Sequence, residues 1–400
     1  MLQLFLMDKR TLTLLLVVFI DLLGFGIVIP ILPILVERIG GDVFLVGVII
    51  SVFSLAQFLF SPIIGRLSDK YGRRPLLITT AFINALSYIL IFFFHSLLLL
   101  FIARIIAGIG SANISVAQAY VADTSKSHER TKKMALIGAA FGLGFIFGPL
   151  IGGVVSETFG PNAPFIIPGI LSLINTMLIY ILLPESNKIL QKHIKIEFLN
   201  LRVTREVLRP KNMAFLLFLF FFVNLSLALI IGVFPIFAQS RFGWNEAQNG
   251  YYFGLIGVSS FITQIYIIRI MLKKWDETQI IRMALLVFGV SVAGIGLSPA
   301  GIFTLLIGPF TSFGFSLLNV NVQSLISLES KPEEQGIVMG TAQSFASLAR
   351  VIGPLIGGTI ATLNLGAPYV ISGIVSLLIL FFGYKYLHYM RTIRTAKTSS

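Results

Sequence analysis

Three ionisable residues lie inside long apolar stretches of this 400-residue sequence, namely Asp21, Arg104 and Arg350. A charged side chain is costly in an apolar environment, so each of them is expected to have a partner or a function. Asp21 is the one residue among 17 acids that lies deep in such a stretch. Because a carboxyl group there can take up and release a proton, proton transfer is the chemistry that the sequence indicates.

Asp21 and Arg104 are expected at similar depths in the membrane. At a helical rise of 1.5 Å per residue they lie about 15 Å and about 20 Å from the same face. If their helices are neighbours, the two side chains can pair. A carboxyl group ionises less readily alone in an apolar site than beside an arginine, so making and breaking the pair would load and release a proton. We interpret Asp21 as a proton carrier and Arg104 as its modulator. The alternative is a static ion pair or a polar helix contact.

The composition describes a membrane protein. Hydrophobic residues make up 56% of the sequence and charged residues only 12%, whereas about 25% are charged in soluble domains. The absence of cysteine excludes a disulfide framework, a thiolate nucleophile and a cysteine metal site. A buried histidine metal site is not expected either, because the histidines fall outside the apolar stretches: His95, His128, His193 and His388.

Twelve apolar stretches are long enough to cross the membrane as helices, which need about 20 residues each. The sequence therefore predicts an all-α polytopic membrane protein, with the ninth stretch unusually short. The predicted spans are Thr11 to Leu35, Phe44 to Gly65, Pro75 to Phe93, Leu97 to Val121, Met134 to Val155, Pro164 to Leu183, Ala214 to Phe237, Gly250 to Ile268, Met283 to Ser298, Ile302 to Leu325, Ile337 to Ala361 and Ala367 to Gly383.

The distribution of positive charge predicts the orientation of the chain. Segments on the side of the N-terminus hold 26 lysines and arginines, and those on the other side hold two, Arg38 and Arg241. Basic residues collect on the cytoplasmic side of membrane proteins, so both termini are expected there. The net charge of +13 therefore reports topology and not a nucleic-acid partner. The first apolar stretch is too long for a cleaved signal peptide and is interpreted as the first span.

An internal repeat divides the chain into two halves. At an offset of 205 positions Pro30 falls on Pro235 and Gln118 falls on Gln323, and the run Gly148 to Gly153 recurs unchanged as Gly353 to Gly358. Such a repeat predicts two parallel six-helix bundles with the substrate site between them. We assign residues 1–183 to the first bundle, 184–213 to a cytoplasmic central loop and 214–400 to the second bundle. The basic helix expected within 194–208 would lie on the inner leaflet.

The repeated run predicts a bendable helix interface. A proline inside a helix removes a backbone hydrogen bond, and glycines one turn away let a neighbouring helix approach closely. Glycines that only pack a tight bundle are the alternative. The residues of this motif are Gly144, Gly148, Pro149, Gly152, Gly153, Gly353, Pro354, Gly357 and Gly358.

The stretch Gly65 to Arg74 has the pattern Gly-x-Leu-x-Asp-x-x-Gly-Arg-Arg, which closely resembles the loop between the second and third helices of major facilitator superfamily transporters. The resemblance implies a conformational latch made of Gly65, Asp69, Gly72 and Arg73. Asp69 would meet an arginine such as Arg73 and the positive N-terminal end of the eleventh span while the transporter faces outward. In the second half, residues 268–278 keep the charges of this loop but lose both glycines.

Three further segments resemble motifs of the twelve-span drug:proton antiporters, the group that contains the tetracycline exporters. They are Asp21 to Pro33, Arg104 to Gly110 and Gly144 to Gly153. In that group the arginine of the fourth helix is implicated in proton coupling. Polar residues inside spans would, by the same resemblance, often face the central cavity, and helix bridging is the alternative for each. These substrate-cavity candidates are Asn113, Gln118, Asn224, Asn319, Gln323, Gln343 and Arg350.

The function predicted is secondary active transport, in which drugs or other amphipathic organic compounds are exported in exchange for protons by alternating access. The chain lacks a phosphate-binding loop, so the proton gradient and not a cofactor or nucleotide is expected to supply the energy. The expected partners are a small organic substrate, protons and the lipid bilayer, with the protein acting as a monomer in the bacterial cytoplasmic membrane.

Two alternatives stay open at this stage. The same fold can move a nutrient, metabolite, siderophore or lipid, with or without protons. A membrane enzyme or sensor is the second alternative, but it would need a reactive constellation or a signalling domain, and the sequence shows neither. The identity of the substrate, the direction of transport and the proton stoichiometry do not follow from the sequence.

Overall fold

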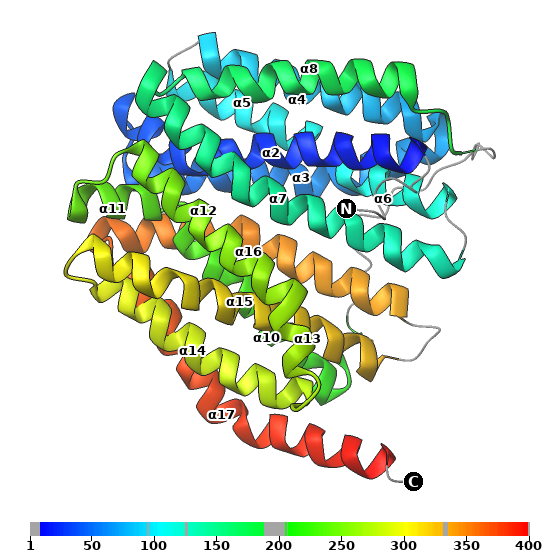
Figure 1. Cartoon of the computed structure of the whole chain (residues 1–400), viewed down its shortest axis with the longest axis vertical. Coiled ribbons are helices and arrows are strands. Elements are labelled where there is room, and N and C mark those ends of the chain that lie inside the picture. Colours follow the sequence, from blue (N-terminus) through cyan, green and yellow to red (C-terminus); the bar gives the residue numbers. More distant parts are fainter. Residues whose placement is uncertain are drawn as a thin grey trace. The chain divides into compact units, whose positions relative to one another are not determined.

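The computed structural model describes residues 9–93, 96–124, 127–187, 205, 207–330 and 335–398. Within these residues twelve helical segments are long and apolar enough to cross a membrane, which confirms the predicted fold class (Figure 1). The helices of the first half are α2 (Lys9–Arg38), α3 (Val43–Tyr71), α4 (Arg73–Phe93), α5 (Leu97–Gly110), α6 (Asn113–Thr124), α7 (Ser127–Phe159) and α8 (Ala163–Leu182). Those of the second half are α10 (Lys211–Ile231), α11 (Phe234–Phe242), α12 (Glu246–Ile262), the π-helical turn η1 (Thr263–Ile267), α13 (Ile268–Met271), α14 (Glu277–Leu297), α15 (Gly301–Glu329), α16 (Gln335–Leu363) and α17 (Ala367–Thr398).

Two predicted spans are interrupted in the structure. The fourth is divided into α5 and α6 by a turn at Ser111 and Ala112, and the seventh ends at Ile231, after which α11 begins as a separate short helix. The ninth span is longer than predicted. It begins at Glu277 because Asp276 and Gln279 form a reciprocal capping box that stabilises a polar first turn. The basic helix expected within 194–208 falls mostly outside the described residues.

The chain forms two compact units, residues 1–198 with 245–254 and residues 199–244 with 255–400. In the first unit α2 packs along α7 and α4 packs along α8. In the second unit α10 packs along α16 and α14 packs along α17. When the six spans of each half are numbered in order, the first packs along the fifth and the third packs along the sixth in both units. The helix pairing therefore repeats in the same way as the sequence.

The repeated glycine run lies on one of these seams in each unit. A Cβ atom added to Gly148 would come within 2.7 Å of the backbone of Gly26 on α2. A Cβ atom added to Gly353 would come 2.5 Å from the Cβ atom of Ala228 on α10. Glycine therefore permits the close approach of α7 to α2 and of α16 to α10. Gly153 points elsewhere, since its added Cβ would lie 2.9 Å from the Cα atom of Gly250 in the part of α12 that belongs to the first unit.

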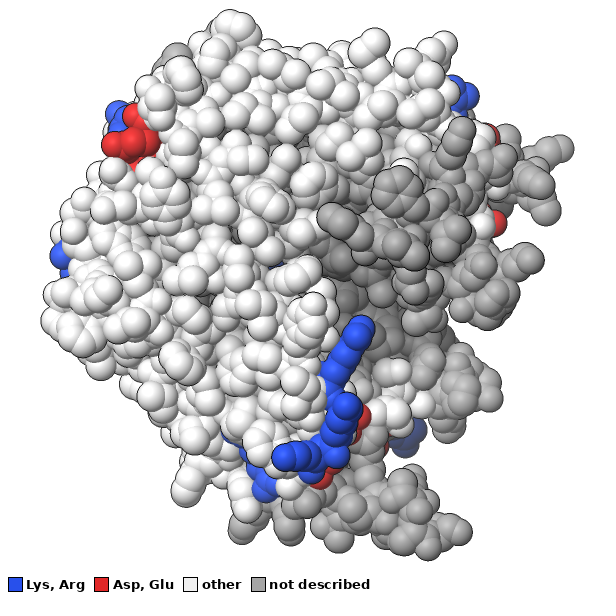
Figure 2. All heavy atoms as spheres, in the orientation of Figure 1, with Lys and Arg blue, Asp and Glu red and all other residues white. Residues whose placement is uncertain are grey.

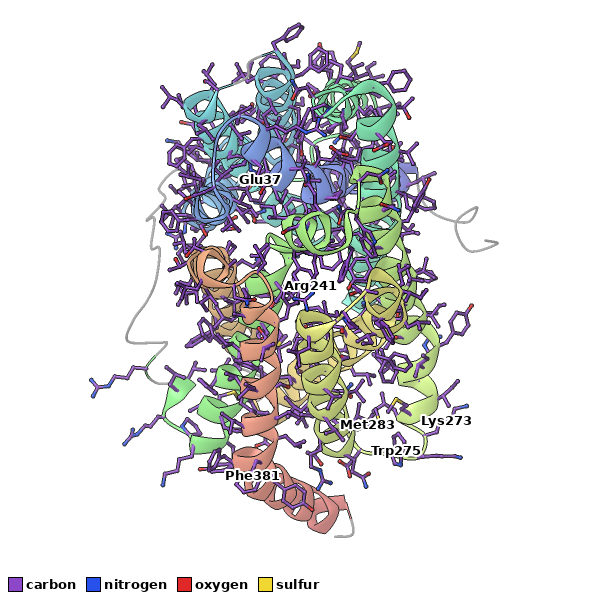
Figure 3. The ribbon with its side chains drawn as sticks, turned by 90° about the vertical axis from the view of Figure 1, so that its left-hand side faces the viewer. Glu37, Arg241, Lys273, Trp275, Met283 and Phe381 are labelled. Carbon is purple, nitrogen blue, oxygen red and sulfur yellow. The ribbon has the colours of Figure 1, made fainter. Side chains whose placement is uncertain are left out.

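Much of the surface of the described residues is apolar. Figure 2 shows a face that is largely uncharged over its upper part, with one group of basic side chains below the centre and a few charged side chains at the rim. Large exposed side chains such as Phe303, Leu306 and Phe310 follow one side of α15, as expected for contact with lipid. In Figure 3 Arg241 lies beside the loop after α14 and donates to the Ser298 carbonyl at 2.9 Å, whereas Lys273 lies at the other end of that helix.

Candidate functional site

The carboxylate of Asp21 is held by two amide side chains from two other helices. Asn113, the first residue of α6, donates a hydrogen bond to Oδ2. Asn175 on α8 donates to Oδ1 at 3.2 Å and to the Val17 carbonyl oxygen at 3.1 Å. Both amides are buried, whereas Asp21 itself is partly exposed. The site thus combines a carboxylate on α2 with two buried amide donors, one from α6 and one from α8.

The interruption of the fourth span brings Asn113 to this site. The break between α5 and α6 frees backbone groups that need other partners. Gln57 on α3 donates to the Ser111 carbonyl at 3.0 Å, and the Ser115 hydroxyl donates to the Ala112 carbonyl at 2.8 Å. Because these side chains satisfy the broken turn, the fourth span can change course there without leaving its carbonyl groups unpaired.

Tyr88 on α4 is a further buried group near Asp21 and Arg104. It is 5% exposed and interacts electrostatically with both Asp21 and Arg104. A Cβ atom on Gly24, one turn beyond Asp21, would lie 3.2 Å from the Tyr88 hydroxyl and 2.9 Å from the Cβ atom of Pro168. Glycine at position 24 therefore leaves the space in which α4 and α8 approach α2 beside the carboxylate.

Arg104 is not paired with Asp21, and this differs from the predicted ion pair. Its guanidinium lies over the ring of Phe53 on α3, 4.1 Å from the centroid, and Phe53 stacks on Phe25 of α2 with centroids 5.5 Å apart. Among the described residues the ion pairs do not include one between Arg104 and Asp21. The physical reason is that Asn113 and Asn175 already hold the carboxylate, while the aromatic face attracts the guanidinium.

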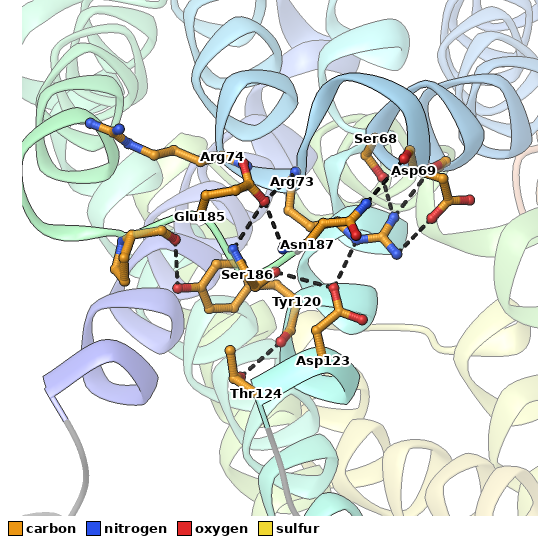
Figure 4. Close-up of polar contacts among 12 residues, drawn as sticks. Ser68, Asp69, Arg73, Arg74, Tyr120, Asp123, Thr124, Glu185, Ser186 and Asn187 are labelled. Atoms are coloured by element: carbon orange, nitrogen blue, oxygen red, sulfur yellow. Dashed lines mark hydrogen bonds and ion pairs between the residues drawn. The ribbon is translucent and has the colours of Figure 1, made fainter. Parts of the chain in front are cut away.

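A second polar cluster, centred on Arg73, lies at the ends of α3, α4 and α6 (Figure 4). Its guanidinium pairs with Asp69 at 2.6 Å and with Asp123 at 3.1 Å, and it lies 2.5 Å from the Ser68 hydroxyl oxygen. Two carboxylates around one buried guanidinium form a charge-assisted network. Gly65 takes part through its carbonyl, which accepts from Arg73 at 3.4 Å. Contact of Asp69 with the eleventh span stays a prediction.

The residues directly after α8 join this cluster. The carboxylate of Glu185 accepts hydrogen bonds from the backbone N–H groups of Arg73 and Arg74, at 2.9 and 3.1 Å, where α4 begins. Gly72, with a φ of +102°, makes room for it, since an added Cβ would lie 2.9 Å from the Glu185 Cδ atom. The predicted central loop therefore begins with a segment that packs on the ends of α3, α4 and α6. Its other contacts are Tyr120 Oη to the Pro184 carbonyl, Ser186 Oγ to Asp123 and Asn187 Nδ2 to the Asp69 carbonyl.

The other predicted cavity residues are described within their own units, and their place at a substrate cavity stays a prediction. Asn224 is buried and donates to the Phe220 carbonyl of its own helix at 2.9 Å. Gln323 donates to Asn319 along α15 at 3.3 Å, and Arg350 donates to Ser347 along α16 at 3.0 Å. The side chains of Gln118 and Gln343 are exposed. Of this set, Asn113 is the one that the structure places against Asp21.

Several residues of the two sites were missed by reasoning from the sequence, among them Tyr88, Asp123, Asn175 and Glu185. Asn175 had a usable signal, because it is an amide in the middle of an apolar span. Asp123 and Glu185 follow the ends of spans, where acidic residues are common and carry no special signal.

Helices of this number and length need a bilayer, and a partly exposed carboxylate held between them is the kind of site at which secondary transporters bind a coupling ion. The protein is thus a polytopic membrane transporter. A family model described as Major Facilitator Superfamily matches residues 14–340 and 284–399, and the chain belongs to that superfamily. The resemblance stated from the motifs is confirmed.

Curated relatives match nearly the full chain. The class B tetracycline resistance protein of Escherichia coli is 28% identical over 88% of each chain. The class H tetracycline resistance protein of Pasteurella multocida is 30% identical over 88% of each chain. Multidrug resistance protein 2 of Bacillus subtilis is 27% identical over 90% of each chain.

Solved structures share the fold. The human organic anion transporter MFSD10 (TETRAN) is 26% identical, with a TM-score of 0.68 over 93% of this chain and 98% of that one. The nucleoside transporter NupG is 15% identical, with a TM-score of 0.75 over 96% of this chain and 99% of that one, and at this identity the likeness shows the fold alone.

Proposed function

We propose that this transporter exports drugs or other amphipathic organic compounds in exchange for protons, and that Asp21 carries the proton. The observation on which the proposal depends is the partly exposed Asp21 carboxylate with Asn113 and Asn175 as donors. An ionised carboxylate accepts both hydrogen bonds, and protonation removes the charge that strengthens them. Binding and release of the proton would thereby change how tightly α6 and α8 are held to α2.

The relatives support the class of substrate. The similar proteins of Escherichia coli, Pasteurella multocida and Bacillus subtilis are named for resistance to tetracycline or to several drugs. A second candidate is export of organic anions, which the similarity to the human organic anion transporter favours. Proton-coupled or facilitated transport of a metabolite would keep the same fold with another substrate.

Arg104 would act as a modulator through the electrostatic field and not through a direct pair in this conformation. Tyr88 interacts with both charges, so a change in the ionisation of Asp21 acts on the surroundings of Arg104. In alternating access a ligand shifts the balance between conformations only if it binds them with different affinity. Protonation of Asp21 on one side and substrate binding on the other would supply that difference, with the proton gradient as the energy source and no cofactor.

The protein is a multi-pass protein of the inner membrane, as its twelve spans and its bacterial relatives indicate. We further propose that both termini are cytoplasmic and that the chain works as a monomer. Lys273 and Lys274, at the turn before α14, would then lie on the cytoplasmic side, in keeping with the excess of basic residues there.

The test is proton movement in proteoliposomes under an imposed pH gradient, with tetracycline and the lipophilic cation ethidium as separate probes. Wild-type protein should release or take up protons when a transported probe is added, and Asp21→Asn should not, although it folds and binds the probe. The control is Glu157→Gln, which changes an exposed acid at the end of α7 and should behave as wild type. Probe movement without proton flux in the wild type would refute proton coupling, and unchanged coupling in Asp21→Asn would refute the carrier.

A further inference from the structure

Asn175 is unusual because its amide group faces two acceptors at once. The side chain is fully buried on α8, and its Nδ2 atom donates both to the Val17 carbonyl and to Asp21 Oδ1. These two acceptors belong to positions four residues apart on α2 and so lie on one side of that helix. The amide nitrogen therefore bridges the backbone of α2 and the carboxylate of the same helix.

The Val17 carbonyl decides which way the amide points. A carbonyl oxygen only accepts hydrogen bonds, so turning the amide round would bring Oδ1 of Asn175 against an acceptor. Oδ1 is buried and has no hydrogen-bond partner within the described residues. An amide that served only to bridge helices would be expected to use its oxygen as well as its nitrogen. Here the donor is used twice and the acceptor is left without a partner.

The second repeat has no counterpart of this amide. When α8, the last span of the first half, is aligned with α17, the last span of the second half, Asn175 falls on Ile379. The side chain of Ile379 is 8% exposed. Helix α17 contains neither asparagine nor glutamine, and α10, the counterpart of α2, contains no acidic residue. The glycine seams are kept in both repeats, whereas the acid and its amide occur together in the first.

We propose that Asn175 is a positioning residue that stabilises the ionised form of Asp21 and so sets the pH range in which the transporter exchanges its proton. The proposal rests on the proposed function of Asp21 as the carrier. With its nitrogen fixed by Val17, Asn175 offers a donor to the carboxylate and no acceptor to a protonated carboxyl group. Removing that donor makes the carboxyl group hold its proton up to a higher pH.

Other titratable and charged groups face this site from the helices packed around it. Tyr88 on α4 interacts electrostatically with Asp21 and with Arg104 on α5. Neither Tyr88 nor Arg104 is changed in the variants below. The other ionisable residues of α6, α7 and α8 lie toward the helix ends: Tyr120, Asp123, His128, Glu129, Arg130, Lys132, Lys133, Glu157 and Tyr180. A shift caused by a change at position 175 is therefore assigned to the lost amide donor.

The first experiment follows the carboxyl C=O stretch of Asp21 by infrared difference spectroscopy of the purified full-length protein, with Asp21→Asn identifying the band. Asn175→Leu should raise the pH midpoint of this band by about one unit, the size expected for one hydrogen bond to a charged group. Thr176→Val is the control, because the Thr176 hydroxyl donates to the Ser172 carbonyl of its own helix.

The second experiment measures the pH profile of tetracycline and ethidium exchange for protons in proteoliposomes. Asn175→Leu should shift the midpoint of this profile to higher pH, by the same amount as the infrared midpoint. In the Asp21→Asn background the same change should leave the pH dependence unaltered. Asn175→Ala serves in place of Asn175→Leu if the leucine variant does not fold. An unchanged infrared midpoint in either variant would overturn the role of Asn175. A shifted midpoint together with probe movement that lacks proton flux would support the positioning role and refute proton coupling.

Discussion

The carboxylate of Glu185 accepts a hydrogen bond from the backbone N–H of Arg73 at 2.9 Å, and so joins the segment after α8 to the first turn of α4. The same carboxylate accepts from the next N–H of that turn, at Arg74. An anion at a helix N-terminus satisfies free N–H groups and complements the helix dipole. The residue that orders the beginning of the central loop is therefore also the one that caps the helix beginning at Arg73.

Replacing Glu185 by alanine should lower the free energy of unfolding by about 1 to 2 kcal/mol, because the first turn of α4 loses its acceptor. Glu185→Gln should lose less, since an amide oxygen can still accept. Thermal unfolding of the purified protein in detergent measures the effect, with exposed Glu157→Ala as the control. Equal stability of Glu185→Ala and the control would show that water replaces the cap.

Asp69→Asn should slow transport while substrate affinity stays largely intact, because the change removes the ion pair between Asp69 and Arg73, which is expected to act as a conformational latch. Asp123 pairs with the same guanidinium. The double variant with Asp69→Asn and Asp123→Asn should therefore lower the transport rate by more than the sum of the effects of the two single variants. The test compares initial transport rates and probe binding for the wild type, the two single variants and the double variant. A selective loss of affinity in Asp69→Asn would count against the latch.

Gly148→Ala should destabilise the first unit by about 1 to 3 kcal/mol, since the added methyl group meets the backbone of Gly26 and the seam must open. Gly353→Ala should act in the same way on the seam with α10. The matched control is Gly340→Ala on α16, where an added Cβ meets no atom of the described residues within 4 Å. Thermal unfolding compares the three, and an effect of Gly340→Ala as large as that of Gly148→Ala would contradict the close-packing explanation.

Arg104→Lys should lower the transport rate although it keeps the positive charge. Lysine lacks the planar guanidinium that stacks on the ring of Phe53. Phe53→Leu removes the other half of the contact and should cause a similar loss, and the double variant should be little worse than either single one. Transport rates in proteoliposomes test this non-additivity. Fully additive losses would mean that Arg104 acts independently of the aromatic ring.

The sequence by itself determined the class of fold and the depth of its charged residues. A helix that crosses the hydrocarbon layer needs about 20 apolar residues, so the twelve spans can be recognised one at a time without knowledge of their neighbours. The depth of Asp21 follows from counting residues along its span. The repeat of Gly148 to Gly153 at Gly353 to Gly358 likewise required no structure.

Only the tertiary structure decided which groups surround Asp21. The similar depths of Asp21 and Arg104 suggested that the two could meet, but depth along a helix says nothing about the direction in which a side chain points around its axis. That direction is set by packing, which turns Arg104 to Phe53 and brings Asn113 and Asn175, 92 and 154 residues along the chain, to the carboxylate. The turn that separates α5 from α6 is stabilised by Gln57 of another helix, so its position could not follow from the local sequence.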